Sequence, residues 1–364
     1  MSNSFEYVFP AIRGLQANKE YYVSMCPLKL IPKIFIFNEE ELIPELRAQR
    51  ILNRTRLPEI TKYILSNRDD YTFSAITASI DSEVRFEPMG GDIGDERLGS
   101  LHVPMTARFI INDGQHRRAA IEMALKENPD LADETIAVVF FLDHGLERCQ
   151  QMFADLNRHA IRPSKSLGVL YDHRDEHSRL ARTVISRAVV FRNLVDMEHS
   201  TLSLRSTKLF TLSSIYNATS VLLADLNVGD FDEQVALASE FWIEVGKQFP
   251  EWEIVRQRKM PASEVRKEFL HSHGIALQAL GRVGNVLLKT NKSKWSNSIS
   301  KISELDWSRS NVLLWEGRAM IGGRVSKANQ NVTLTTNALK KHLGLELVGD
   351  ELVLEEAFLR GEKR

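Results

Sequence analysis

The stretch from residue 107 to residue 126 constrains the fold more than any other part of the chain. An apolar run, 107–111, leads into the pair Asp113-Gly114, and a helix-forming run, 119–126, follows. An apolar run that stops at Asp-Gly before a helical pattern is typical of a strand, a tight turn and a helix. The sequence therefore predicts an α/β fold with polar chemistry gathered in this turn.

The predicted turn carries the side chains of a phosphate site. Gln115, His116, Arg117 and Arg118 directly follow Gly114. A helix N-terminus presents unpaired N–H groups and a partial positive charge, and arginines add to both. We expect Gly114, Gln115, His116 and Arg117 to bind a nucleotide phosphate. A solvated, charged helix start without a ligand is the alternative.

The acid and the imidazole of the turn each have two interpretations. Asp113 can cap the helix, or it can hold Mg²⁺ through water when a nucleotide is bound. His116 can be a general base in a nucleotide hydrolase, or a structural or phosphate-binding histidine. Neighbouring helical residues diverge by about 100°. We therefore expect Arg117 to face the ligand and Arg118 to pair with Glu122.

Composition is that of an ordinary globular protein: the 364 residues are 43% hydrophobic and 26% charged, with a formal net charge of −1. We find no apolar run of about 18 residues and no signal segment, and expect a cytoplasmic protein without a membrane partner. Cys26 and Cys149 are too few for a Cys-rich metal site. His173 and His177 have metal-ligand spacing, but a solvated helix face is the expected interpretation.

Positive charge is unevenly distributed along this nearly neutral chain. Eight Arg and Lys but three Asp and Glu lie between residues 157 and 192. A second group comprises Arg256, Arg258, Lys259, Arg266 and Lys267. Such segregation can steer a polyanion to one surface, whereas ordinary solvated helix faces are the alternative.

Periodicity predicts the remaining elements. Strands are expected at 30–37, 73–80 and 135–142, and helices at 41–66, 146–157, 231–249, 263–289 and 335–342. Because one helix separates the strand before Asp113 from strand 135–142, we expect these two strands to form a parallel, adjacent pair. We expect three domains, at 1–165, 166–300 and 301–364.

Several segments resemble a known family. Residues 113–117 spell the DGQHR motif, and further matching segments lie at 25–33, 46–50, 57–60, 153–158, 307–311 and 315–319. Together they resemble the DndB family of DGQHR-domain proteins, which belong to DNA phosphorothioation systems. The resemblance covers most of the chain.

The resemblance implies a ParB/sulfiredoxin-like core in a mixed α/β fold, followed by a mainly helical region and a small C-terminal region. It implies a repressor of the modification genes that binds promoter DNA, with ATP or CTP and Mg²⁺ as a further ligand. A homo-oligomer or other DNA-modification proteins are further expected partners. Gln115 and His116 occupy the place of the sulfiredoxin catalytic cysteine, so reductase chemistry is not implied.

Further site residues lie outside the turn. We expect Asn157 and Arg158 to join the nucleotide site, with a basic loop at a domain junction as the alternative. The candidate DNA-binding residues are Cys26, Arg162, Lys165, Arg318, Arg324 and Lys327. Cys26 has the alternative role of a buried small hydrophobe, and Trp307 and Trp315 are expected to share a core face.

Three functions follow from these observations. A DNA-binding regulator is the leading hypothesis. The second is an NTPase that uses Asp113 and His116, and the third is a scaffold for the modification proteins.

Overall fold

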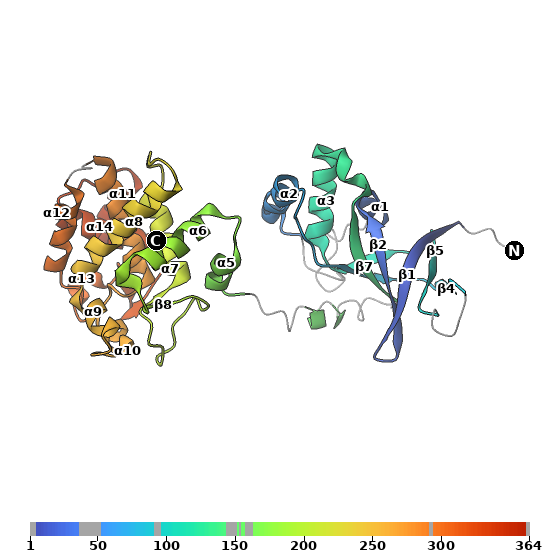
Figure 1. Ribbon diagram of the computed structural model, residues 1–364, viewed down its shortest axis with the longest axis horizontal. Coiled ribbons are helices and arrows are strands. Elements are labelled where there is room, and N and C mark those ends of the chain that lie inside the picture. The colour runs from blue at the N-terminus through green and yellow to red at the C-terminus, as the bar shows by residue number, and fades with distance from the viewer. Residues whose placement is uncertain are drawn as a thin grey trace. The chain divides into compact units, whose positions relative to one another are not determined.

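The computed structural model describes residues 5–35, 52–90, 96–142, 151–152, 154–156, 163–290 and 294–361 (Figure 1). The chain divides into two compact units, Met1–Ile161 and Arg162–Arg364. The first contains a seven-stranded sheet and the second is mainly helical, so the fold is mixed α/β. The division into three domains stays a prediction. Among the residues described, no helix has both the length and the apolar character needed to cross a membrane.

The sheet of the first unit has the strand order β4-β5-β1-β2-β7-β3-β6. Its strands are β1 (Glu6–Gln16), β2 (Lys19–Pro27), β3 (Ile76–Ile80), β4 (Arg85–Pro88), β5 (Leu98–Pro104), β6 (Phe109–Asp113) and β7 (Thr135–Leu142). All neighbours are antiparallel except β3 and β7. The sheet is therefore mixed.

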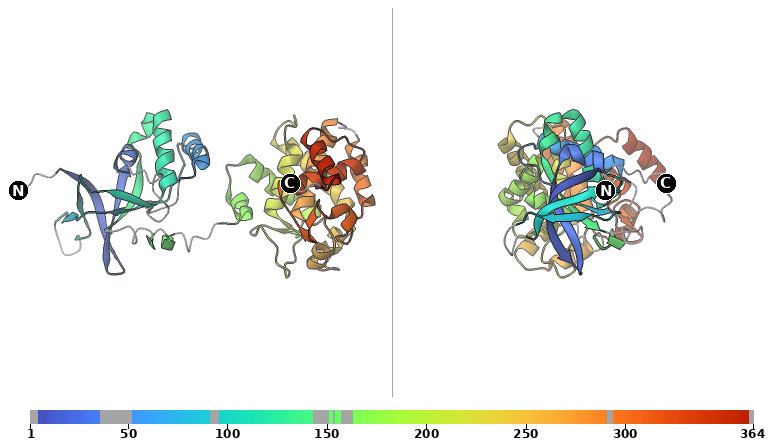
Figure 2. Two further views of the ribbon diagram at one scale, coloured as in Figure 1. Left: turned by 180° about the vertical axis from the view of Figure 1, so that it is seen from behind. Right: turned by 90° about the vertical axis from the view of Figure 1, so that its right-hand side faces the viewer.

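The hairpin β1–β2 begins the sheet. Ala17 and Asn18 both have positive φ, 49° and 60°, in the two-residue turn between the strands. Such left-handed pairs match the twist of a two-residue hairpin. The turn lies at the end of the hairpin farther from α3 (Gln115–Glu127) in both long views (Figures 1 and 2).

The strand expected at 30–37 is wrong, because the described part of that segment is helical. Leu28–Leu30 forms the 3-10 turn η1 and Ile31–Ile34 forms α1. Proline fits the first turn of a helix, and Pro32 takes that position here. Ile31 and Ile34, three residues apart, are both buried on the same side of the turn.

The strand, turn and helix around Asp113 are confirmed as β6 and α3, and the next strand as β7. The parallel neighbouring pair is wrong. β3 lies between β6 and β7, parallel to β7 and antiparallel to β6. Its residues Ile76, Ala78 and Ile80 are fully buried, which suits a central strand.

Helices of the first unit pack beside α3, which buries Ala119, Ala120, Ile121 and Ala124. α1 and α2 (Leu57–Ser66) both contact it. The helix expected at 41–66 is confirmed over α2, and its first part lies outside the described residues. Within the helix expected at 146–157, the five described residues are helical.

The second unit is a bundle of helices with two small strand pairs among its described residues (Figure 1). Its helices are α5 (Lys165–Tyr171), α6 (Glu176–Arg187), α7 (Leu212–Leu223), α8 (Phe231–Lys247), α9 (Pro250–Arg256), α10 (Ala262–Glu268), α11 (Gly274–Thr290), α12 (Trp295–Ser300), α13 (Val312–Trp315), α14 (Asn329–His342) and α15 (Asp350–Leu359). Its short strands are β8 (Val195–Asp196), β9 (Phe210–Thr211), β10 (Met320–Ile321) and β11 (Arg324–Val325).

The expected long helices are partly confirmed. α8 matches 231–249, whereas 263–289 is divided into α10 and α11. The helix expected at 335–342 is the end of α14, and Gly344 follows with φ 69°. A glycine just past the last turn is the usual way to end a helix.

Glycines let α7 and α11 come into close contact. A Cβ on Gly281 would lie 2.3 Å from the Ala218 carbonyl oxygen, and one on Gly284 would lie 2.6 Å from the Leu222 side chain. Neither position has room for a larger residue unless the helices move apart. The contacts advance along both helices in the same direction, so α7 and α11 run parallel.

Tryptophans fill the core of this unit. Trp242, Trp252 and Trp315 are almost completely buried. Trp307 and Trp315 stack with ring centroids 5.3 Å apart, which confirms that they share a core face. Trp307 lies before α13, whereas Trp315 is the last residue of that helix.

A buried ion pair joins the C-terminal segments. Both guanidinium Nη atoms of Arg318 lie 2.7 Å from the two Oε atoms of Glu355. The two side chains are 8% and 3% exposed. Burial alone would raise the pKa of Glu355, but the hydrogen bonds and charge of Arg318 outweigh it and hold that pKa at about 2.

We expect Glu355→Gln to lower the free energy of unfolding at pH 7 by about 3 kcal/mol, because it leaves Arg318 buried without its counterion. A carboxyl whose pKa is depressed by folding stabilises the protein above its unfolded pKa, and this contribution is lost as pH falls toward 2. Urea unfolding between pH 7 and pH 3 should show the difference between wild type and variant shrinking. The exposed neighbour variant Glu356→Gln is the control, and an equal effect of both changes would contradict the prediction.

Candidate functional site

Gly114 makes the turn between β6 and α3 possible. It is the N-cap residue of α3, with φ 110° and ψ 13°. This left-handed region favours glycine. A Cβ here would also lie 3.0 Å from both Arg117 Nη2 and Ile76 Cγ1. The glycine therefore brings the helix start close to β3.

Arg117 holds the turn together. Its Nη2 lies 2.7 Å from Asp113 Oδ2 and donates to the Ala75 carbonyl at 3.1 Å, while Nη1 donates to Ser74 Oγ at 2.7 Å. The side chain is 19% exposed. Arg117 thus ties the end of β6 to the segment that leads into β3, and its contact with a ligand stays a prediction.

The carboxylate of Asp113 does not cap α3. The structure shows no side-chain cap at this helix, and the first turn contains no acidic residue. Asp113 pairs with Arg117 and its side chain is about half exposed. The cap interpretation is therefore not observed, and the Mg²⁺ role of Asp113 stays a prediction.

His116 and Arg118 bind neighbouring segments. His116 Nε2 accepts a hydrogen bond from the Asn53 N–H at 3.1 Å, just before the 3-10 turn η3 (Arg54–Arg56). Arg118 donates to the Phe35 carbonyl at 3.0 Å and pairs with Glu122, as expected. Burial alone would raise the pKa of Glu122, but its bond with Lys126 and the charge of Arg118 lower it.

Sequence alone did not identify the partners of this turn. Ser74, Ala75 and Asn53 lie about forty to sixty residues before it in sequence. They meet the turn only because β3 pairs with β6 and η3 lies beside α3. Gln115 also forms an interaction within the structure. The turn is thus a connected polar network.

The expected second part of the nucleotide site is not described. Asn157, Arg158 and Arg162 lie outside the described residues. Lys165 belongs to the second unit, where its Nζ donates to Asn217 Oδ1 at 2.7 Å. The nucleotide and DNA contacts expected of these residues therefore stay predictions.

Cys26 lies inside the first unit. It is fully buried on β2, and burial raises the pKa of its thiol to about 11. A thiol with such a pKa stays protonated and unreactive near neutral pH. The structure favours the alternative of a small buried hydrophobe.

Of the basic residues expected near the C-terminus, Arg318 is internal and two are exposed. Arg318 also donates to the Leu334 carbonyl at 3.1 Å and stacks over the Phe358 ring at 4.3 Å. Its burial favours a structural role over the predicted contact with DNA. Arg324 and Lys327 are exposed, and in the described part of the chain neither side chain forms a hydrogen bond or an ion pair.

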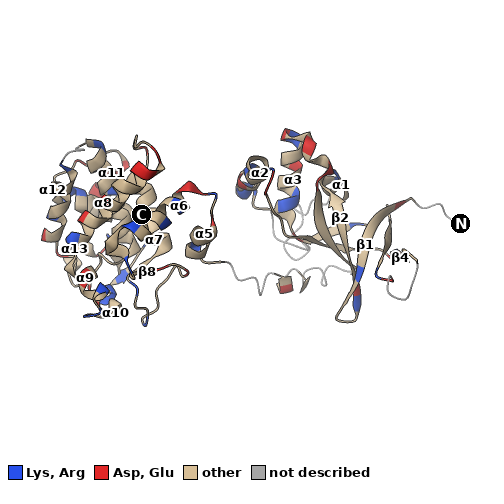
Figure 3. Ribbon diagram, viewed as in Figure 1, with Lys and Arg blue, Asp and Glu red and all other residues tan. Residues whose placement is uncertain are grey.

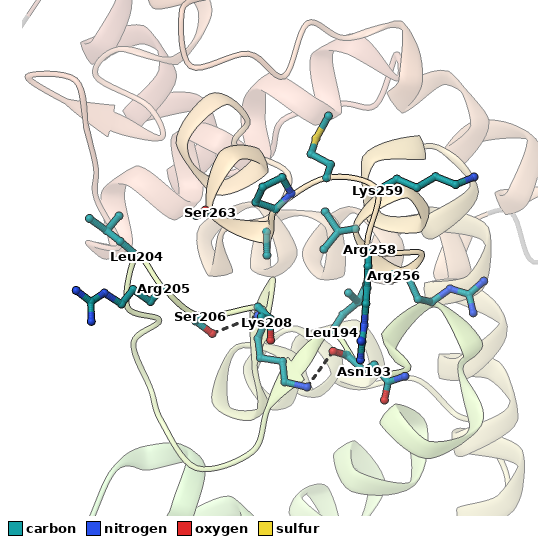
Figure 4. A pocket seen from close by; sticks show the side chains of 15 residues that line it. Asn193, Leu194, Leu204, Arg205, Ser206, Lys208, Arg256, Arg258, Lys259 and Ser263 are labelled. Carbon is teal, nitrogen blue, oxygen red and sulfur yellow. Dashed lines mark hydrogen bonds between the residues drawn. The ribbon is translucent and has the colours of Figure 1, made fainter.

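A cavity of about 670 Å³ in the second unit is lined by basic residues of the segments 205–208 and 256–259; we call it the wide basic cavity (Figure 4). Its basic lining residues are Arg205, Lys208, Arg256, Arg258 and Lys259, and no acidic residue lines it within the described ranges. Blue segments also gather near α9 and α10 in the charge view (Figure 3). Three residues of the second basic group of the sequence, Arg256, Arg258 and Lys259, thus line one cavity.

The cations of this cavity differ in their partners. Arg256 forms two hydrogen bonds with Glu253, and Lys208 Nζ donates to the Asn193 carbonyl at 2.9 Å. Arg205 and Arg258 are exposed, and their side chains form no hydrogen bond or ion pair with a described residue. Sequence reasoning missed Arg205 and Lys208, although residues 199–224 contain no Asp or Glu.

The comparisons with known proteins give one match. The model of the DndB family, described as DNA-sulfur modification-associated, matches residues 9–346. The search of curated proteins found no match. Nor did any solved structure match.

The network at the turn predicts that Arg117 stabilises the first unit. Arg117→Met should lower the free energy of unfolding by about 2 kcal/mol, because it removes an ion pair and two hydrogen bonds. Lys126→Met on the same helix removes only an exposed pair with Glu122 and should cost below about 0.5 kcal/mol. Chemical denaturation measures both, and equal losses would speak against the network.

Proposed function

Because the chain belongs to the DndB family of DNA-sulfur modification-associated proteins, we propose that it is a DNA-binding regulator that represses the DNA phosphorothioate modification genes. Promoter DNA of those genes is the proposed partner. The observation that carries DNA binding is the wide basic cavity, which five cations line without a lining carboxylate in the described ranges.

The physical basis is local charge rather than total charge. The chain has a formal net charge of −1, so a diffuse attraction to DNA is not its means of binding. Cations without counterions attract phosphates and release bound salt ions when they meet them. Arg205 and Arg258 meet this condition, and Arg324 and Lys327 are further exposed cations of the same unit.

The proposal predicts the salt dependence of binding. Arg205→Gln combined with Arg258→Gln should weaken binding of a promoter duplex about tenfold and reduce the slope of log K against log salt by about 2. Fluorescence anisotropy measures the duplex affinity and its salt slope. Titrations between about 50 and 200 mM salt cover the range in which phosphate contacts weaken. Lys247→Gln removes an exposed lysine already paired with Glu244, so it serves as the control.

Two results would contradict this assignment. One is that the double variant binds the duplex with the same affinity and the same salt slope as the wild type. The other is an equal loss in the Lys247→Gln control, which would show only the effect of total charge.

We further propose the DGQHR turn as a nucleotide phosphate site, with ATP or CTP and Mg²⁺ as ligands. What supports it is the start of α3, which has no acidic residue in its first turn and no capping side chain. Backbone N–H groups at such a start suit a phosphate. An NTPase with Asp113 and His116 in catalytic roles is the alternative function of this turn.

Nucleotide titration tests the turn directly. His116→Ala should weaken ATP or CTP binding at least tenfold, because the imidazole lies in the first turn of α3. His177→Ala, in the second unit, should leave binding unchanged. Calorimetry with and without Mg²⁺ measures affinity, and phosphate release that is lost in His116→Ala identifies a hydrolase. The absence of nucleotide binding, or equal binding by both variants, would refute the site.

A ParB/sulfiredoxin-like core for the first unit is also a proposal, supported by the order β6, glycine turn and α3. Self-association and binding to other DNA-modification proteins stay predictions.

A further inference from the structure

A second, smaller cavity of the helical unit has unusual chemistry. Its volume is about 330 Å³, and we call it the narrow basic cavity. Four basic residues line it: Arg266, Lys267, Arg309 and Lys327. Six hydroxyl side chains join them, and within the described ranges no Asp or Glu does. It shares Leu204 and Ser263 with the wide basic cavity, so the two are neighbours.

The two guanidinium groups of this cavity are held by carbonyl oxygens. Arg266 donates to the carbonyls of Ser203 and Lys208, with 2.7 Å to the former. Arg309 donates to the carbonyls of Lys267 and Gly323 at 3.2 and 2.9 Å. Carbonyls satisfy the donors and fix the positions of the groups, but they do not neutralise the two positive charges.

Lys327 is the free cation of the cavity. Its ammonium forms no hydrogen bond or ion pair with any described residue. It lies close to the first residue of α11, because a Cβ built on Gly274 would be 3.2 Å from Lys327 Nζ. A glycine there leaves the ammonium and the helix start open to a shared ligand.

Two parallel helices begin at this cavity. Thr211 and Ser214, at the start of α7, and Gly274, at the start of α11, all line it. The N–H groups of Gly274 and Ile275 have no acceptor among the described residues. The partial positive charge of the α11 start therefore adds to the charge of the side chains, whereas Thr211 and Ser166 accept hydrogen bonds from the first N–H groups of α7.

The arrangement costs stability while the cavity is empty. Lys267 pairs with Glu268 at 3.5 Å, but Arg266, Arg309 and Lys327 have no counterion among the described residues. These three cations repel one another, and burial adds a desolvation penalty. Burial and the nearby charges of Arg309, Lys327 and Arg266 lower the pKa of His273 to about 4, which reports the same positive field. Unfavourable charge of this kind is expected at binding sites, where a ligand supplies the missing partner.

We propose that the narrow basic cavity binds a phosphate group, with Lys327 Nζ and the N–H groups of Gly274 and Ile275 as its contacts. The phosphate is either that of a free phosphomonoester or one from the DNA backbone. The assignment stands apart from the proposed regulation, since it needs no gene target. A protein that fails to bind promoter DNA can still bind phosphate here.

Calorimetry with inorganic phosphate, in low-salt buffer without other polyanions, tests the cavity. The wild type should bind with a Kd below about 1 mM. Lys327→Gln should weaken this binding at least tenfold. Lys289→Gln makes the same charge change near the other end of α11 and should alter the Kd less than twofold. Gly274→Ala crowds the ammonium without removing it and should also weaken binding.

A labelled duplex separates the two sources of phosphate. If the cavity holds a backbone phosphate, Lys327→Gln weakens duplex binding about tenfold. If it holds a free phosphomonoester, deoxyadenosine monophosphate binds and the duplex affinity is unchanged. The proposal is overturned if phosphate binds Lys327→Gln and Lys289→Gln equally. It is also overturned if neither free ligand binds the wild type and Lys327→Gln leaves duplex affinity unchanged.

Discussion

The contact between α7 and α11 is the constraint on which the helical unit depends. Gly281 lets the backbone of α11 approach the Ala218 carbonyl, and Gly284 makes room for Leu222 and Phe241. The parallel arrangement that results brings both helix starts to one place. Buried side chains along α11 then join the tryptophan-rich core. The narrow basic cavity exists because of this packing.

The two units use their charged residues in different ways. In the first unit the arginines of the turn bind Asp113, Glu122 and backbone carbonyls, so their donors are largely occupied within the protein. In the second unit Arg205, Arg258 and Lys327 find no such partner among the described residues. Free cations rather than occupied ones attract a polyanion. We therefore propose that the helical unit binds DNA.

Local pattern predicted the elements around the turn well. The strand, glycine turn and helix follow from neighbours in sequence, as does the pair Arg118–Glu122 four residues apart. The position of β3 between β6 and β7 was not predictable, because strand order depends on which strand is buried on both faces. The strand expected at 30–37 failed since a short apolar run fits a strand or a helical turn equally.

The candidate site shows the same division between local and long-range information. The sequence identified the cluster Arg256–Lys267 and Lys327, but only the fold brings them together with Arg205 and Arg309. The sequence pattern also grouped Arg318 with the surface cations Arg324 and Lys327. The partner that buries it, Glu355, lies 37 residues away on α15. Burial of a charge is decided by such distant partners, which no local pattern reveals.

The central claim is that cations of the helical unit receive the phosphates of DNA. Hydrogen–deuterium exchange of the full chain, with and without promoter duplex, tests it most directly because it locates the contact. The account predicts slower exchange in segments 199–210 and 255–276, which contain the described basic lining residues of the wide cavity and the start of α11. Protection confined to the first unit, with these segments unchanged at saturating duplex, would contradict it.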